Sequence, residues 1–473
     1  MSTEPPINSD LLEARLDKLS GGPAIERIRA RLQGADDRRL FRVNPYTFAA
    51  EEGVAPERAV ELFLRAAALG LFRAEWLLVC RGCGEYVLTH AGLRDLEAVV
   101  HCVTCARSRD ANLDESVEVA FTVHPDIRQI RYANPASLTP EDYFTSYALC
   151  PSILVRGEGR SLVEHVRLGA KVMTRLAAGA SHTFDVELEV GWIVGSPRMM
   201  ITVEGEPTSE LREVTLRLEG TAFTPRPKLA PGPARVTLVN GTDRDTFVLS
   251  YFTPIVTYFD YLPFLSGQRL LNSPEFRRHL GTEVVRPGSA IPTRDNTLLF
   301  SDLRGSTALY DHVGDVAAFE LVSTHLERLA RVITRHSGVV VKTIGDAVMA
   351  SFTRPVDAVR AAFEMGGELQ GLGDEGQLAL KIGIHRGPCL VVNVRDEIDY
   401  FGQTVNIAAR VQGLAKSGEV CLTDAVLEGA EVAQVVAEHR QAAHPGSAAS
   451  PLPSESVGLR GVGTPCVVHR LGG

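Results

Sequence analysis

The chain has 473 residues, enough for about three domains, and its 45% hydrophobic and 23% charged residues are typical of globular proteins. The formal net charge of −9 excludes a polycationic surface, so nucleic acid is not expected as the main partner. No apolar run reaches the roughly 18–20 residues of a membrane span. The first residues also lack a basic start and an apolar core. We therefore expect a cytoplasmic protein that does not enter a membrane.

The first 115 residues predict a helical segment over 1–43 and a second region over 44–115. Two short helices, Pro45 to Glu51 and Pro56 to Leu69, are followed by a strand from Leu71 to Cys80. Helix, turn, helix and strand in this order are typical of a winged helix. The second helix carries alternating acidic and basic residues without a basic stripe, so we expect a structural or protein-binding role rather than DNA binding.

Four of the eight cysteines form two CxxC pairs, Cys80 with Cys83 and Cys102 with Cys105. Two such pairs separated by a loop of this length are typical of a tetrahedral zinc knuckle, and a redox dithiol is the alternative interpretation. Four thiolates would leave no open coordination position, so the predicted zinc is structural. The other cysteines lie in apolar surroundings and are expected to be small buried side chains.

Residues 116–264 predict a β-sandwich-like module, and 265–291 a helical connector. Short alternating strands recur with turn signals between them, among them Val117–Val123, Thr183–Val190, Arg212–Leu218 and Arg235–Val239. In the connector, Pro274–Leu280 is expected to be a helix. The whole is a multidomain α+β chain, in which the middle module has the position of a regulatory domain.

Residues 292–473 change to an α/β rhythm. The pattern predicts the following elements: strand Thr297–Asp302, helix Val316–His336, hairpin strands Val339–Thr343 and Ala347–Phe352, helix Pro355–Glu368, strand Leu378–His385, helix Thr404–Leu414 and strand Pro465–Leu471. The stretch Gly446–Ser454 is expected to be a loop.

Two aspartates end apolar segments of this domain. Asp302 follows a buried strand and precedes the small-residue turn Leu303, Arg304, Gly305, Ser306 and Thr307, which opens a helix and predicts a phosphate-binding loop. Asp346 lies at the tip of the next hairpin, where Gly345 permits a tight turn. If the two tips are adjacent, both carboxylates can hold a pair of divalent cations about 3.5–4 Å apart.

Four ordered stretches resemble the catalytic domain of the class III adenylate/guanylate cyclases. They are Phe300-Ser-Asp-Leu-Arg-Gly-Ser-Thr307, Lys342-Thr-Ile-Gly-Asp-Ala-Val-Met-Ala-Ser-Phe352, Ile382-Gly-Ile-His-Arg-Gly-Pro388 and Asp399-Tyr-Phe-Gly-Gln-Thr-Val-Asn-Ile-Ala-Ala-Arg410. The resemblance implies a ferredoxin-like α/β domain that converts a nucleoside triphosphate to its 3′,5′-cyclic monophosphate and pyrophosphate.

The resemblance also implies the site residues. Asp302 and Asp346, with the Leu303 carbonyl, would hold two Mg²⁺ or Mn²⁺ ions in each active site. Asn406 would orient the ribose, and Arg410 would stabilise the charge that develops on the α-phosphoryl group. Ser306 departs from the phenylalanine that many members have there. Arg304, Arg386 and a residue of the C-terminal tail are candidates for binding the terminal phosphates.

Two further positions would read the purine, namely Lys342 and the residue seven before Asn406, which is Asp399. A lysine donor matches N1 of adenine, and an aspartate acceptor matches its 6-amino group. Guanine offers the reverse pattern and would leave buried groups unpaired. We therefore expect ATP as substrate, with a guanylate cyclase as the alternative.

Lys342 and Asp346 lie on opposite arms of one hairpin and are hard to aim into a single pocket. In the family the metal aspartates come from one subunit and the other site residues from its partner. We therefore expect a head-to-tail homodimer with two equivalent sites. The short segment between Gly387 and Asp399 argues against a long dimerisation arm.

The N-terminal half resembles the poorly characterised region, with a cysteine-pair knuckle and a β module, that precedes cyclase domains in some soluble bacterial proteins. We expect it to regulate the catalytic subunits through an unknown ligand or protein. Two other hypotheses remain open: a catalytically silent nucleotide-binding regulator, and a zinc-stabilised DNA- or protein-binding N-terminus attached to a cyclase.

Overall fold

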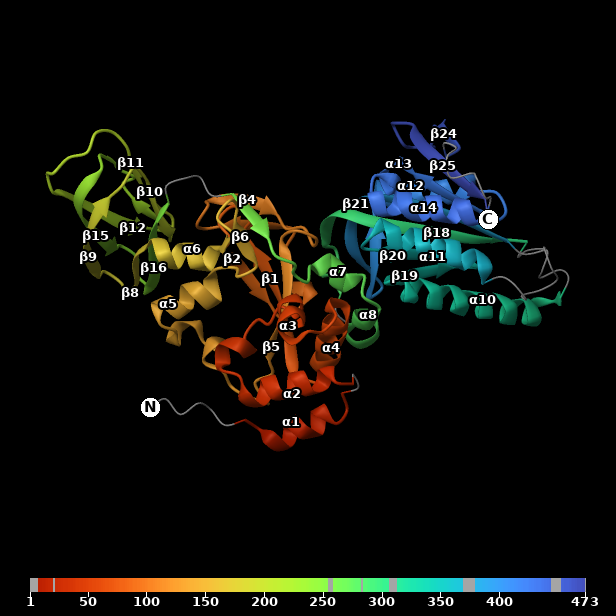
Figure 1. Ribbon diagram of the computed structural model, residues 1–473, viewed down its shortest axis with the longest axis horizontal. Helices are drawn as coiled ribbons and strands as arrows, with labels where there is room; N and C mark the ends of the chain where they lie inside the picture. The colour runs from red at the N-terminus through yellow and green to blue at the C-terminus, as the bar shows by residue number, and fades with distance from the viewer. Residues whose placement is uncertain are drawn as a thin grey trace. The chain divides into compact units, whose positions relative to one another are not determined.

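The computed structural model describes residues 7–19, 22–253, 258–281, 284–305, 313–368, 379–443 and 452–472 (Figure 1). The chain divides into two compact units. The first contains residues 1–92, 99–111 and 116–265, and the second contains residues 93–98, 112–115 and 266–473. Within the described residues, no helix combines the length and the apolar character needed to cross a membrane.

The first unit begins with helices packed on a three-stranded antiparallel sheet of order β2-β1-β5. The elements are α1 (Ser9–Leu16), α2 (Ala24–Gly34), α3 (Pro45–Glu52), α4 (Pro56–Ala68), β1 (Phe72–Val79), β2 (Tyr86–His90) and β5 (Val117–Val123). Helix α4 buries an apolar stripe that includes Leu62 and Phe63, and the Phe63 ring packs on Phe48, Phe72 and Phe121. The elements occur where we expected them, and the winged-helix comparison stays a prediction.

The boundary of the β-rich module differs from the predicted start at residue 116. Strand β5 pairs with β1 along its whole length instead of joining the sandwich, and every one of its residues is buried. The next stretch is irregular, with α5 (Pro140–Asp142), β6 (Ile153–Val155), β7 (Arg160–Ser161), α6 (Leu162–Gly169) and, later in the chain, β17 (Phe259–Tyr261) paired to β6. Alternation alone predicts a strand but not its partner.

A sandwich of two sheets follows over residues 170–253. One sheet has the order β14-β11-β10-β16-β8 and the other β13-β12-β15-β9, and inward residues of both form one core. The strands are β8 (Ala170–Leu176), β9 (Ser181–Leu188), β10 (Gly191–Ser196), β11 (Met199–Val203), β12 (Arg212–Glu219), β13 (Ala222–Thr224), β14 (Lys228–Leu229), β15 (Gly232–Asn240) and β16 (Thr246–Thr253).

The second unit is built on an eight-stranded sheet of order β19-β20-β18-β21-β23-β25-β24, in which β22 also pairs with β21. The strands are β18 (Ala290–Arg304), β19 (Gly338–Ile344), β20 (Ala347–Phe352), β21 (Ala379–Val394), β22 (Glu397–Phe401), β23 (Glu419–Thr423), β24 (Ser454–Val457) and β25 (Cys466–Gly472). The helices are α7 (Gly267–Leu271), α8 (Pro274–Leu280), α10 (Asp315–Arg335), α11 (Pro355–Gly367), α12 (Gln403–Leu414), α13 (Asp424–Leu427) and α14 (Ala430–Ala443).

Helices cover the two faces of this sheet unequally (Figure 1). Side chains of α10, α11 and α14 form one core with the sheet, whereas α12 contributes to a smaller core on the other face. In β23, Leu422 belongs to the first core and Cys421 to the second, as the alternation of a strand requires. Gly383 of β21 allows α12 to lie this close, because a Cβ there would be 2.1 Å from the Gln412 backbone nitrogen.

Candidate active site and cysteine cluster

The two aspartates lie at the same end of neighbouring strands. Ser301 of β18 pairs with Val348 of β20, so Asp302 and Asp346 both follow that pair toward the β19–β20 turn. Gly345 adopts the left-handed conformation (φ 65°) that this tight turn requires. The Asp302 carboxylate is half-buried and lies 3.9 Å from the Lys381 ammonium of β21.

The Asp346 side chain suits a cation. Its Oδ2 atom is buried and has no hydrogen-bond partner within the described residues. An unpaired buried carboxylate oxygen is costly, and a bound divalent cation would satisfy it, so the donor set fits Mg²⁺ or Mn²⁺. Of the predicted phosphate-binding loop, the structure describes Leu303, Arg304 and Gly305. Ser306 and Thr307 lie outside the described residues.

Lys342 and Asp399 lie 57 positions apart in the sequence, and the fold brings them into contact. The Lys342 ammonium donates to Asp399 Oδ2 at 2.6 Å, and Asp399 Oδ1 accepts the Tyr400 amide at 2.8 Å. Neighbours two residues along each strand point to the same face. Ile344 and Phe401 therefore flank the ion pair, and they are 55% and 67% exposed.

A buried polar network that the sequence did not reveal holds the strand of Asp399. The Tyr400 hydroxyl and the Ser351 hydroxyl both donate to Asn272 Oδ1, at 2.9 and 2.8 Å. Asn272 is 2% exposed and lies just after α7. The connector is therefore hydrogen-bonded to β22 next to Asp399. The Arg277 guanidinium of α8 donates to the Ile398 carbonyl at 3.3 Å on the other side. A lone asparagine in a helical connector carries no local signal of such a role.

Helix α12 carries both predicted catalytic residues. Asn406 is exposed, and Arg410 lies one turn later and is half-buried. Within the described part of the chain, Arg410 Nη1 is buried without an acceptor. A buried cationic donor without a partner is expected where an anionic ligand binds. Its guanidinium lies beside the loop between β24 and β25, since a Cβ on Gly461 would be 3.6 Å from Arg410 Nη2.

Other polar residues of the cyclase-like stretches already form hydrogen bonds or ion pairs within the protein. Arg386 makes a two-pronged ion pair with Asp295, with distances of 2.6 and 2.5 Å, so it is a poor candidate for the terminal phosphates. Arg304 donates to Ser417 at 2.9 Å and remains exposed. Burial lowers the pKa of His385 to about 4, and its Nδ1 contacts the Thr423 hydroxyl at 2.8 Å.

Helix α10 contributes one buried histidine that the sequence reasoning missed. His325 is 1% exposed, and neither ring nitrogen has a hydrogen-bond partner within the described residues. Burial lowers its pKa to about 4, and the Asp346 charge opposes that shift. The imidazole is therefore neutral at pH 7 and lies within the electrostatic reach of the Asp346 carboxylate.

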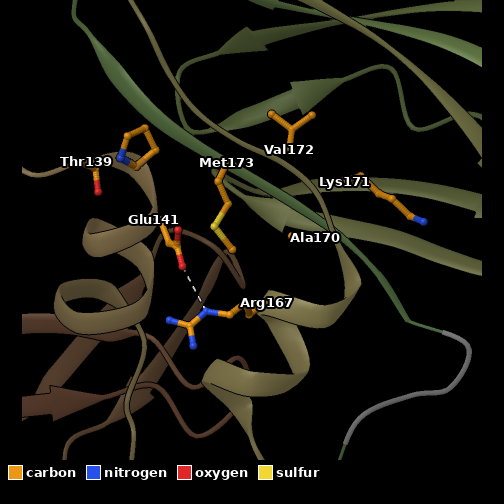
Figure 2. Close-up of a pocket in the computed structure, with 8 residues that line it drawn as sticks. Thr139, Glu141, Arg167, Ala170, Lys171, Val172 and Met173 are labelled. Carbon is orange, nitrogen blue, oxygen red and sulfur yellow. Dashed lines mark ion pairs between the residues drawn. The ribbon is translucent and has the colours of Figure 1, made fainter.

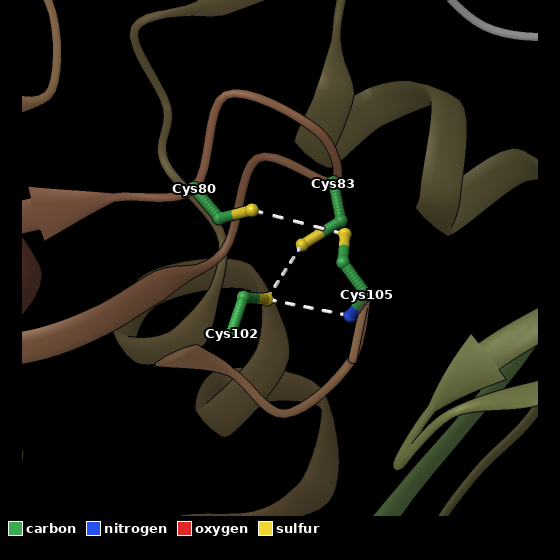
Figure 3. A group of neighbouring side chains, drawn as sticks. All are labelled: Cys80, Cys83, Cys102 and Cys105. Carbon is green, nitrogen blue, oxygen red and sulfur yellow. Dashed lines mark hydrogen bonds between the residues drawn. The ribbon is translucent and has the colours of Figure 1, made fainter. Parts of the chain in front are cut away.

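The four cysteines of the first unit form one cluster (Figure 3). Their sulfurs all lie within 4.8 Å of one another, and two Sγ–Sγ distances are 3.7 Å (Cys80–Cys105) and 3.6 Å (Cys83–Cys102). Tetrahedral zinc with Zn–S bonds of about 2.3 Å requires sulfurs roughly 3.8 Å apart. The cluster therefore fits one zinc ion. Of the other cysteines, Cys150, Cys389 and Cys421 are buried, whereas Cys466 is half-buried.

Comparison with known families assigns most of the chain. Residues 8–278, more than half of it, match a family of unknown function (DUF5939). Residues 290–444 match the adenylate and guanylate cyclase catalytic domain. The chain belongs to the first family and carries a class III cyclase domain. The coarse predictions of a cyclase domain and of a mixed α/β fold for it are thereby confirmed.

Two curated relatives each match less than a third of the chain. An adenylate cyclase of Anabaena cylindrica is 32% identical over 152 residues, which are 29% of this chain and 30% of the relative. The receptor-type adenylate cyclase GRESAG 4.3 of Trypanosoma brucei brucei is 30% identical over 177 residues, covering 28% of this chain and 14% of the relative. The chain thus spans less than a third of the length of these two relatives.

Among solved structures, the adenylyl cyclase CyaB from P. aeruginosa is 20% identical and covers 38% of this chain and 95% of that chain, with a TM-score of 0.32. The guanylyl cyclase Cya2 is 23% identical and covers 38% of this chain and 92% of that chain, with a TM-score of 0.30.

Proposed function

We propose that this protein is an adenylate cyclase, which converts ATP to 3′,5′-cyclic AMP and pyrophosphate in a head-to-tail homodimer. The observation that carries the choice of ATP is the contact between Lys342 and Asp399. The relatives named as adenylate cyclases support the same assignment.

The Lys342–Asp399 pair matches adenine in its hydrogen-bonding pattern. The ammonium is a donor for N1, which in adenine is an acceptor, and the carboxylate is an acceptor for the 6-amino group. Guanine would place its N1–H against the ammonium and its O6 against the carboxylate. Both contacts would be unfavourable in a site that excludes water, which is why GTP is disfavoured.

The residues of the chain have separate tasks in the reaction. Asp302, Asp346 and the Leu303 carbonyl would hold two divalent cations, which would supply positive charge to the triphosphate and acidify the ribose 3′-hydroxyl. Asn406 orients the ribose, so that its 3′-oxygen is in line with the bond to be broken. The 3′-oxygen bonds to the α-phosphorus as the bond to pyrophosphate breaks, and the hydroxyl proton passes to solvent water. Arg410 donates to the α-phosphoryl oxygens.

The distribution of these groups supports the proposed dimer. Lys342 and Asp346 occupy one hairpin, and Lys342 faces Asp399 rather than the turn that bears Asp346. One copy then provides the metal-binding carboxylates, and the partner provides the purine-reading pair and Arg410. The side chains of Ile344 and Phe401, which flank the pair and are exposed in the single chain, would be buried in such an interface.

Exchanging the purine-reading residues tests the choice of substrate. In the Lys342→Glu, Asp399→Ser variant, we expect kcat/KM for ATP to fall by about 10²–10⁴, with GTP turnover rising above the wild-type level. Cyclic AMP and cyclic GMP are quantified side by side by mass spectrometry. The control is Thr343→Ser, because this neighbour alternates to the other face of β19. A variant that still prefers ATP would contradict the assignment.

The four cysteines are proposed to hold one structural zinc ion in a regulatory N-terminal half. We expect one zinc per chain by elemental analysis in the wild type and in the control Cys466→Ser, and less than a tenth of that in Cys102→Ser. Because structural zinc contributes strongly to folding, Tm of the first unit should fall by about 10 °C or more.

The same two variants test regulation by the N-terminal half. If the cyclase rate of Cys102→Ser equals that of the control, a regulatory role of this half is contradicted.

A further inference from the structure

A cavity of about 530 Å³ lies in the first unit between the cysteine cluster and the β-sandwich. Its floor is the outer face of the five-stranded sheet, where Trp192 and Val194 of β10 and Tyr251 of β16 line the cavity. The intervening Ile193 points into the sandwich core. The volume lies within the range of roughly 300–1,000 Å³ that is usual for sites of small organic ligands.

The opposite wall comes from the two hairpins of the cysteine cluster. Glu85 accepts a hydrogen bond from the Thr104 hydroxyl at 2.6 Å, and Thr104 lies 3.3 Å from the Ser196 hydroxyl of the floor. This chain of polar groups joins the two walls. Burial raises the pKa of Glu85, the one carboxyl among the described lining residues. The wall is therefore fixed in place, and its acidic group is already occupied.

The outer face of the sheet is unusually apolar where it lines the cavity. Trp192 is half-buried, and Met200 is 39% exposed beside the buried Met199. The outer face of an antiparallel sheet is ordinarily polar. An indole and the flexible thioether of Met200 at one opening are suited to a flat apolar body, because a thioether adapts to varied shapes and contacts rings favourably.

The charged part consists of three arginines, Arg107 and Arg109 on one face of β4 and Arg198 between β10 and β11. Arg109 lies against the cluster, since a Cβ on Gly82 would be 2.6 Å from its Nη2 and 3.3 Å from Cys105 Sγ. It can offset the negative charge of a zinc–thiolate centre. Arg107 and Arg198 have no ion-pair or hydrogen-bond partner for their side chains among the described residues.

We propose that this cavity binds a small organic anion with a flat, apolar or aromatic body. Arg107 and Arg198 hold the anionic group, and Trp192 and Val194 contact the body. An anion would pair with two arginines that line the cavity and have no ion-pair partner in the described part of the chain, and the apolar floor would add affinity for an organic anion over inorganic phosphate.

The full-length, zinc-containing protein is titrated with two related fluorescent probes. One is the aromatic anion 1-anilinonaphthalene-8-sulfonate, and the other is the neutral N-phenyl-1-naphthylamine. We expect one saturable site for the anion per chain. In Arg107→Gln, Arg198→Gln, its Kd should rise tenfold or more, while the Kd of the neutral probe changes less than threefold. Trp192→Ala should weaken the binding of both probes.

A matched control removes two positive charges from a second cavity of the same unit, of about 510 Å³ (Figure 2). There Arg167 pairs with Glu141 at 3.2 Å, and Lys171 points away from that pair. Arg167→Gln, Lys171→Gln should leave both Kd values unchanged. Zinc content and Tm establish that each variant is folded. Equal effects of the two double variants on the anion, or no saturable binding of it to the wild type, would overturn the proposal.

Discussion

Replacing either aspartate of the proposed metal site, in Asp302→Ala or Asp346→Ala, is expected to lower kcat by at least about 10³-fold with Mn²⁺ and ATP. Each carboxylate lies at the same end of adjacent strands, and Asp346 Oδ2 has no other partner in the described part of the chain. Losing one carboxylate would remove a main ligand of the divalent cation, which would then no longer neutralise the charge on the triphosphate.

The control is Asp396→Asn, which removes one carboxylate of the same unit. Asp396 lies in the β21–β22 turn with φ 62°, a conformation that asparagine tolerates, and its side chain is 79% exposed. It should keep wild-type activity. Circular dichroism and Tm of the aspartate variants should stay near wild type, and Mn²⁺ affinity measured by electron paramagnetic resonance should fall with activity. An Asp302→Ala protein with wild-type turnover would refute the metal-site assignment.

Complementation between two inactive chains is the second expected result. Asp302→Ala and Arg410→Ala are each expected to be inactive as homodimers. If the active site takes its carboxylates from one subunit and its arginine from the other, a heterodimer of the two has one intact site. Such a heterodimer, isolated through two different affinity tags, should have about half the wild-type activity, because one of its two sites is complete.

The reciprocal pairing provides the control. A heterodimer of wild type with the double variant Asp302→Ala, Arg410→Ala should be inactive, because each of its sites lacks one group. If all catalytic groups came from one chain, the two results would be exchanged. Gel filtration verifies that both heterodimers stay associated during the assay. The comparison therefore separates a shared site from two independent ones, whatever the absolute rate.

Much of the catalytic unit could be predicted from local sequence. Helix α8 begins and ends at the predicted residues because Ser273 caps its first turn, with Phe276 N donating to its hydroxyl, and Pro274 is suited to the first helical position. The length of β21 could not be predicted in the same way. The predicted strand ends at His385, but β21 continues past Arg386, the candidate for phosphate binding, to Val394. Arg395 and Asp396 then turn the chain back with positive φ values.

The sequence by itself determined the residue types of the candidate site and their order, because the carboxylates, the amide and the guanidinium occur in motifs that resemble those of a cyclase domain. The resemblance also predicted that Lys342 and Asp399 meet at the purine, whereas the contacts themselves were decided by the tertiary structure. The Lys342–Asp399 contact, the grip of Asn272 on Tyr400 and the cavity beside the cysteine cluster all join residues far apart in the chain. Capping and alternation act over a few residues, whereas strand pairing and burial depend on the whole chain.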